Sequence, residues 1–153
     1  MYPNAFVALL NNQHIWIAVT SCLSAQVMKA LIGYSYSKKF DKALLLSTGG
    51  MPSSHSAFVV AMAASVGIAE GLHSPVFAVA MIFAIIVMYD AAGVRRAAGK
   101  HAEVINNLVE RLQSIGITPA EKLKELLGHS PIEVVGGAIW GLLVTTLAYW
   151  VLS

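Results

Sequence analysis

Four apolar segments, each close to the length of a membrane-spanning helix, constrain what this chain can fold into. They cover residues 15–34, 54–72, 75–94 and 131–152. The hydrocarbon core of a bilayer is about 30 Å thick, which takes roughly 20 apolar residues in helical form. The sequence therefore predicts an all-α, polytopic membrane helix bundle of about four transmembrane helices, forming a single membrane-embedded domain over residues 1–153.

The overall composition supports lipid rather than water as the solvent. Of the 153 residues, 57% are hydrophobic and only 12% are charged, whereas soluble domains carry about 25% charged residues. The net charge of +2 comes from 10 Lys and Arg against 8 Asp and Glu, which does not indicate a basic patch, so nucleic acid is not an expected partner. Cys22 is the single cysteine, which excludes an intrachain disulfide and a cysteine-based zinc site. We expect no metal and no cofactor.

A polar stretch, residues 95–130, separates the third and fourth segments and is predicted to form a helical insertion at the membrane interface. Thr118 to Glu121 has the form of a capping box, with Pro119 at the first helical position. The basic residues lie in the two loops that emerge on one side: Lys38, Lys39, Lys42, Arg95, Arg96, Lys100, Arg111, Lys122 and Lys124. Residues 70–74, on the other side, contain no Lys or Arg. Both basic loops are therefore predicted to face the cytoplasm.

A glycine- and serine-rich stretch, residues 47–56, leads directly into the second apolar segment. Gly49 and Gly50 allow a close backbone approach, Pro52 suits the start of a helix, and His55 lies in the first helical turn. Backbone amides at a helix N-terminus bind anions, and a histidine there can give a proton to a leaving oxygen. An ordinary serine-capped helix start explains the same residues.

The start of the fourth segment carries a second constellation. His129 and Glu133 are four residues apart, so on a helix the carboxylate can approach the imidazole, fix its tautomer and support a nucleophilic nitrogen. Ser130 and Glu133 also form a capping box. At this level the carboxylate is either a cap or an orienting group, and both alternatives stay open.

Together, these two segments resemble the second and third signature motifs of the type 2 phosphatidic acid phosphatase and vanadium haloperoxidase superfamily. Pro52-Ser53-Ser54-His55 matches a motif of proline, serine, usually glycine, and histidine, with serine in place of glycine. His129 and Glu133 match a motif of histidine followed after three residues by aspartate, with glutamate in place of aspartate. The pattern over nearly the full chain is similar to the small divergent branch of that superfamily, whose members are bacterial and plant membrane proteins. A bacterial cytoplasmic membrane is the expected location.

The resemblance implies a membrane phosphatase acting on a lipid phosphate or diphosphate. His129 would form a phosphohistidine, Glu133 would orient it, and His55 would be the general acid for the leaving group. Ser53, Ser54 and the backbone amides after Gly50 would hold the phosphate oxygens. Lys29, with Arg95 or Arg96, would neutralise the charge that develops in the transition state.

The first and third motifs also lack arginines that the superfamily pattern has. Lys29 is followed by Tyr36, where the first motif has arginine-proline. Leu123 stands six positions before His129, where the third motif has arginine, and Arg95 precedes His129 by 34 positions. A competing register pairs Arg95 with His101 at the six-residue offset, but the residue four positions beyond His101 is Ile105 and not a carboxylate. We therefore favour His129.

Several other residues have two possible roles, and two other functions are possible. Asp90, at the end of an apolar segment, is either a site residue or the partner of Arg95 or Arg96 in an ion pair. His101 either supports the site or belongs to a solvated helix face. Glycines 136, 137 and 141 permit close helix packing, which would serve a homodimer. The alternatives to a phosphatase are a non-catalytic relative that binds an anionic headgroup or a protein partner, and a small transporter or channel.

Overall fold

The computed structural model describes residues 4–38, 49–114 and 128–152, and the described chain is helical with no strands. This confirms the predicted all-α membrane helix bundle. The helices are α1 (Ala5–Leu10), α2 (Gln13–Ser37), α4 (Ser54–Glu70), α5 (Pro75–Ala92), α6 (Val94–Ser114) and α7 (Pro131–Leu152). The predicted helix start at Thr118 lies outside the described residues.

Short polar side chains set where the helices begin. Ser53 caps α4 and Ser74 caps α5, and each accepts a hydrogen bond from a backbone amide in the first turn. Asn12 does the same for α2. Pro75 and Pro131 open their helices, at a position where the missing N–H would have no partner inside the helix. The bounds of the four apolar helices therefore follow local chemistry, and they match the predicted segments to within a few residues.

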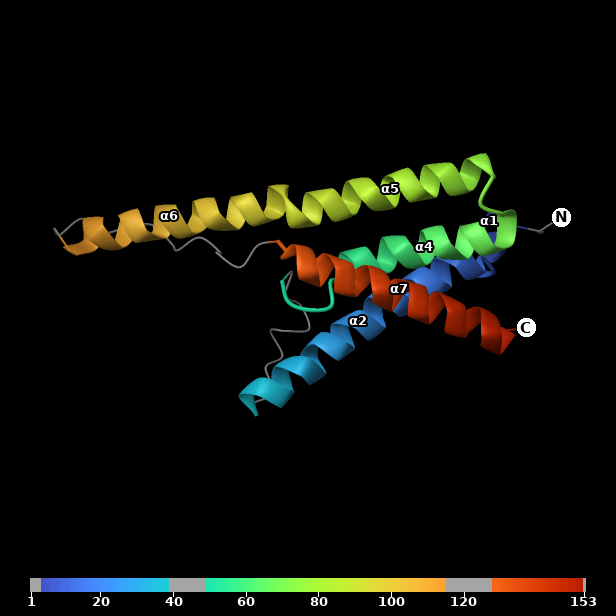
Figure 1. Ribbon diagram of the computed structural model, residues 1–153, viewed down its shortest axis with the longest axis horizontal. Coiled ribbons are helices and arrows are strands. Elements are labelled where there is room, and N and C mark those ends of the chain that lie inside the picture. Colours follow the sequence, from blue (N-terminus) through green and yellow to red (C-terminus); the bar gives the residue numbers. More distant parts are fainter. Residues whose placement is uncertain (1–3, 39–48, 115–127, 153) are drawn as a thin grey trace.

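In the part of the chain that the structure describes, three helices are long and apolar enough to cross a membrane: Gln13–Ser35, Pro75–Leu112 and Pro131–Leu152. The fourth apolar helix, α4, has 17 residues and is about 25 Å long. It is the centre of the bundle, since it contacts α2, α5 and α7. Figure 1 shows it between these neighbours. Small residues make this possible, and its buried positions are Ala, Ser, Val and Gly.

The contact between α4 and α7 depends on small residues spaced four apart. A Cβ atom added at Gly141 would lie 2.7 Å from the carbonyl oxygen of Ala57, and one at Gly137 would meet the backbone of Ser53. One turn further on, the Thr145 hydroxyl donates to the Ala61 carbonyl at 3.3 Å. Close backbone approach through small residues is typical of membrane helix contacts. Here it joins two helices of one chain, so Gly137 and Gly141 are not available to the homodimer contact for which they were considered.

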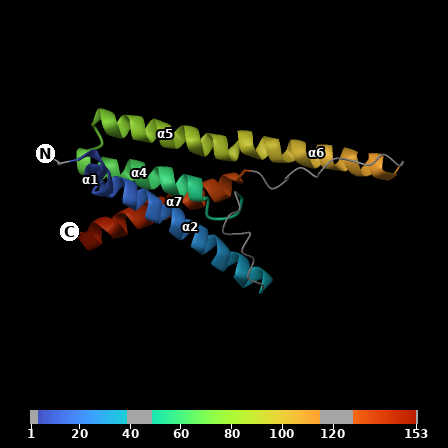
Figure 2. The same ribbon diagram turned by 180° about the vertical axis from the view of Figure 1, so that it is seen from behind.

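Helices α5 and α6 form one long rod (Figures 1 and 2). Residues 75–112 cover 38 positions, or about 57 Å of helix, which exceeds the roughly 30 Å hydrocarbon core. Among the helices that the structure describes, α6 contacts only α5. Residues 95–114 of the predicted insertion are helical, and this helix continues the direction of α5.

Candidate active site

The two sequence constellations meet at one end of the bundle, where α4 and α7 begin and α5 ends. Two backbone hydrogen bonds join these elements: His129 N donates to the Ala91 carbonyl at 2.9 Å, and Ser53 N donates to the Glu133 carbonyl at 3.0 Å. The described end of α2 lies toward the same end of the molecule (Figures 1 and 2). The fold thus brings the two motifs together although residues 57–128 separate them in the sequence.

His55 and His129 lie side by side in this region. Their ring centroids are 5.8 Å apart, with an edge-to-face angle of 66° between the ring planes. His129 is 1% exposed, and His55 is partly buried in the first turn of α4. Two imidazoles at this distance can flank a single small anion or a phosphoryl group.

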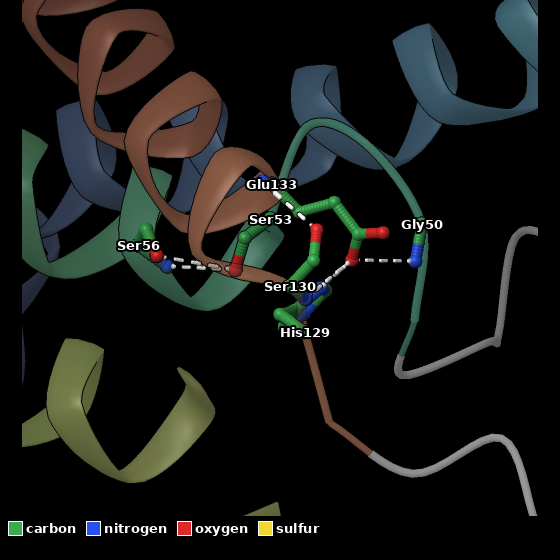
Figure 3. Close-up of polar contacts among 6 residues, drawn as sticks. All are labelled: Gly50, Ser53, Ser56, His129, Ser130 and Glu133. Atoms are coloured by element: carbon green, nitrogen blue, oxygen red, sulfur yellow. Dashed lines mark hydrogen bonds and ion pairs between the residues drawn. The ribbon is translucent and has the colours of Figure 1, made fainter. Parts of the chain in front are cut away.

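Glu133 is the centre of the hydrogen-bond network in Figure 3. Its Oε2 atom accepts from His129 Nδ1 at 2.9 Å, from Gly50 N at 3.2 Å and from Ser130 N at 3.3 Å. Its own amide donates to Ser130 Oγ at 3.4 Å. The Glu133 carboxylate therefore caps the helix and also bonds to the imidazole, so both alternative interpretations are correct. Because a carboxylate only accepts, Nδ1 is the donor, and in the neutral imidazole Nε2 then has the lone pair.

Lys29 reaches the same network from α2. Its side chain is 3% exposed and packs over Gly50, where an added Cβ atom would lie 3.2 Å from Lys29 Cδ. Gly50 has a φ of +95°, which L-residues with side chains rarely adopt. The ammonium group lies near enough to Glu133 for a favourable charge interaction. Glycine at position 50 thus allows the positive φ of the turn and leaves space for the Lys29 side chain.

The serines of the first motif are buried around the start of α4. Ser53 Oγ accepts from Ser56 N at 3.3 Å and from the Ser56 hydroxyl at 3.2 Å, so Ser53 has the helix-capping role that the alternative interpretation gave it. Ser54 is 4% exposed. Sequence reasoning named Ser53 and Ser54 but missed Ser56, although the three-residue spacing from Ser53 is the usual spacing for a serine cap.

The remaining predicted residues lie around the end of α5 and on α6. Asp90 is partly buried and directly precedes Ala91, whose carbonyl binds His129. The backbone of Arg95 lies in the first turn of α6; its side chain lies outside the described part, and Arg96 is exposed. His101 is exposed on α6, which does not contact α4 or α7 within the described chain. The structure thus places His129, and not His101, beside His55.

A match to the Divergent PAP2 family covers residues 10–144 of this chain. The chain belongs to the Divergent PAP2 family. Every candidate site residue lies inside the matched range. The chain is also 46% identical to the uncharacterized membrane protein YuiD of Bacillus subtilis strain 168, over 93% of this chain and 98% of that protein. No solved structure matches.

Membership of the Divergent PAP2 family and the apolar helices agree on an integral membrane protein related to the PAP2 proteins. The site of this family member contains a histidine pair, a carboxylate and a lysine. Within the described residues, no three His, Cys, Asp or Glu side chains are grouped as metal ligands. The polar groups at hand are those of acid–base and nucleophilic chemistry.

Proposed function

We propose that this protein is a membrane phosphatase that hydrolyses a lipid phosphate or diphosphate through a phosphohistidine on His129. The observation that carries the proposal is the pair of imidazoles 5.8 Å apart, one of them bonded through Nδ1 to Glu133 at 2.9 Å. A nucleophile oriented by a third group, next to a second proton-transfer group, is the usual arrangement for covalent catalysis. Family membership supports phosphate ester chemistry.

In the first step, the lone pair on His129 Nε2 attacks phosphorus, and the bond between phosphorus and the leaving oxygen breaks. The imidazolium form of His55 gives its proton to that oxygen, so the lipid alcohol or lipid phosphate leaves in protonated form. The positive charge that develops on His129 is stabilised by the Glu133 carboxylate at Nδ1.

In the second step, water attacks the phosphohistidine. His55, now neutral, takes a proton from the water, and the bond between Nε2 and phosphorus breaks to release inorganic phosphate. Both residues return to their starting forms. Lys29, together with Arg95 or Arg96 at the start of α6, supplies positive charge for the phosphoryl oxygens in both steps.

The proposed site opens toward the cytoplasm, because the described basic residues near it, Lys38, Arg96 and Lys100, are exposed beyond the bundle. Single cysteines at positions 38 and 130, in a Cys22→Ser background, test this in intact cells and in inverted vesicles. Both positions should be labelled by an impermeant thiol reagent in inverted vesicles only. Labelling of the two positions from opposite faces would contradict a shared site.

Phosphate release by purified, reconstituted protein tests the activity. A panel of lipid phosphates and diphosphates is incubated with the wild type and with His129→Ala and His55→Ala variants. The wild type should release phosphate, both variants should be inactive, and vanadate should inhibit the wild type. Radiolabelled substrate should leave an acid-labile phosphoryl group on the wild type and none on His129→Ala.

A second candidate is a non-catalytic protein that binds an anionic headgroup, and two replacements in the superfamily motifs favour it. Tyr36 stands where the first motif has arginine, and Leu123 stands where the third motif has arginine. This candidate predicts saturable binding of a lipid phosphate without turnover. It also predicts that Lys29→Ala weakens binding while His55→Ala does not.

A further inference from the structure

An apolar groove of about 420 Å³ lies between α4, α5 and α7, outside the polar network of the candidate site. This volume is within the usual range of about 300–1,000 Å³ for small-molecule sites. Residues from all three helices line it, among them Val60, Ala64, Gly67, Met81, Met88 and Thr146. The groove is partly open, and its lining residues Met81, Leu142 and Thr146 are exposed at the surface of the bundle, so a ligand can enter it from the bilayer.

The groove exists because small and large side chains are distributed unevenly between the facing helices. On α4 the lining residues include Ala63, Ala64 and Gly67, which leave space beside the helix axis. On α5 the larger residues Ile82 and Phe83 are exposed at 60% and 57% and turn away from α4. The methionines on α5 that do face the groove have flexible, adaptable side chains.

The side chains that line the groove are almost all apolar. Thr146 carries the one hydroxyl among the lining residues, and it donates within its own helix to the carbonyls of Leu142 and Leu143, each at 3.0 Å. The groove therefore favours an apolar ligand, because a polar ligand would lose hydrogen bonds to water without replacement.

The groove begins just below the candidate site. Met88 lies three residues before Ala91, whose carbonyl binds His129, and Val60 lies five residues after His55 on α4. These offsets correspond to about 5 to 8 Å along the helices. From Met88 to Phe77, at the far end, the groove covers about 16 Å of helix, close to half of the roughly 30 Å hydrocarbon core. An anion site next to an apolar groove of this length fits an amphiphile, with its phosphate in the site and one hydrocarbon chain in the groove.

We propose that this groove binds the hydrocarbon chain of the lipid whose phosphate group lies between His55 and His129, and that its length sets the preferred chain length. The proposal rests on the proposed function for the position of the phosphate. Phe77 closes the far end, since its ring packs over Gly67, where an added Cβ atom would lie 2.9 Å from it.

Chain-length dependence of phosphate release tests the groove. Butyl, dodecyl and hexadecyl phosphate are compared for the wild type, for Ala64→Phe, which fills the groove, and for Ala78→Phe, a matched change at an exposed position of α5 outside the lining. Ala64→Phe should lower kcat/KM for hexadecyl phosphate by about tenfold or more, because apolar contacts are lost, and leave butyl phosphate within about twofold. Ala78→Phe should change neither. An equal effect of Ala64→Phe on all three substrates, or no effect, would overturn the groove.

A photolabelling experiment tests whether a lipid chain binds in the groove, and it does not depend on phosphate release. Hexadecyl phosphate with a diazirine at the end of its chain is irradiated with reconstituted wild type and with Ala64→Phe, and labelled residues are identified by mass spectrometry. Labels should concentrate at Leu72 and Phe77 in the wild type and be lost in Ala64→Phe. Labels spread over exposed residues such as Phe83 and Ile86, in both proteins alike, would mean that bulk lipid fills the groove. Concentrated labels without phosphate release would contradict the phosphatase and leave the groove intact.

Discussion

The two ends of the bundle each contain a hydrogen-bonded histidine, and the difference between them shows what makes one a candidate site. At one end, His129 Nδ1 bonds to Glu133 at 2.9 Å. At the other, His14 Nδ1 bonds to the Ser65 hydroxyl at 2.7 Å, and Ser65 also contacts the Tyr149 hydroxyl at 3.3 Å. Both clusters link neighbouring helices, and α4 contributes to both.

The two histidines differ in the chemical group that each of them bonds to. A carboxylate can only accept a hydrogen bond, so Glu133 fixes the tautomer of His129 and stabilises positive charge on it. A hydroxyl donates or accepts, so Ser65 imposes neither on His14. A second imidazole, His55, lies 5.8 Å from His129, and Lys29 adds charge at the same end. The hydrogen bond of His14 therefore contributes to helix packing alone. That of His129 has a possible chemical role as well, because charged groups and a second imidazole lie beside it.

Removing each histidine in turn tests this comparison most strongly. His129→Ala should lower phosphate release at least about a thousandfold, because the nucleophile is lost. His14→Ala should stay within about twofold of the wild type. Initial rates on a saturating lipid phosphate measure both, with circular dichroism as the check that the variants are helical. Comparable losses in the two variants would mean that the ends of the bundle are not chemically distinct.

The carboxylate is the next difference to test. Glu133→Gln should lower kcat about a hundredfold, the scale at which groups that orient a ligating or reacting histidine act, while KM changes little. Glu133→Asp, which keeps the charge, should recover part of the loss. Steady-state kinetics across a pH range make the measurement, since a merely structural role would leave the shape of the pH profile unchanged. Equal kinetics for the Gln and Asp variants would refute the orienting role.

Much of the fold was predictable because it depends on local pattern. Apolar runs of spanning length, serine caps and prolines at helix starts fixed the helices α2, α4, α5 and α7 to within a few residues. The short helix α1 was missed, since its six residues carry no spanning signal. The continuity of α5 and α6 was missed as well, because the polar stretch that starts at Arg95 predicted separate helices at the membrane interface.

The meeting of His55 with His129 followed from the resemblance to a known family, since no local pattern links residues so far apart. The three hydrogen bonds to Glu133 Oε2 could not be predicted from spacing alone. Ser130 and His129 are neighbours of Glu133 in sequence, but Gly50 is 83 positions away, and only the packed helices bring its amide there. For the same reason the sequence assigned no role to His14, whose partner Ser65 is on another helix.

Helix packing near the site gives a third test. Gly137→Ala should destabilise the protein by about 2 kcal/mol or more, because the added Cβ atom would meet the Ser53 backbone, which cannot move aside. Gly136→Ala is the matched control, since its Cβ atom would lie 2.9 Å from Met51 Cε, the end of a flexible side chain. Thermal unfolding in detergent measures both. Similar stabilities of the two variants would contradict the close contact of α4 with α7.

The smallest effect is expected at the far end of the bundle. Ser65→Ala removes the hydroxyl that contacts His14 and Tyr149 and should lower the free energy of unfolding by about 1 kcal/mol, the usual net value of a hydrogen bond. Phosphate release should stay within about twofold of the wild type, as the change is about 18 Å along α4 from Ser53. Thermal unfolding of Ser65→Ala, His14→Ala and the double variant measures their coupling. A tenfold loss of phosphate release in Ser65→Ala would mean that the far cluster controls the site, and the distinction between a packing histidine and a reacting one would then fail.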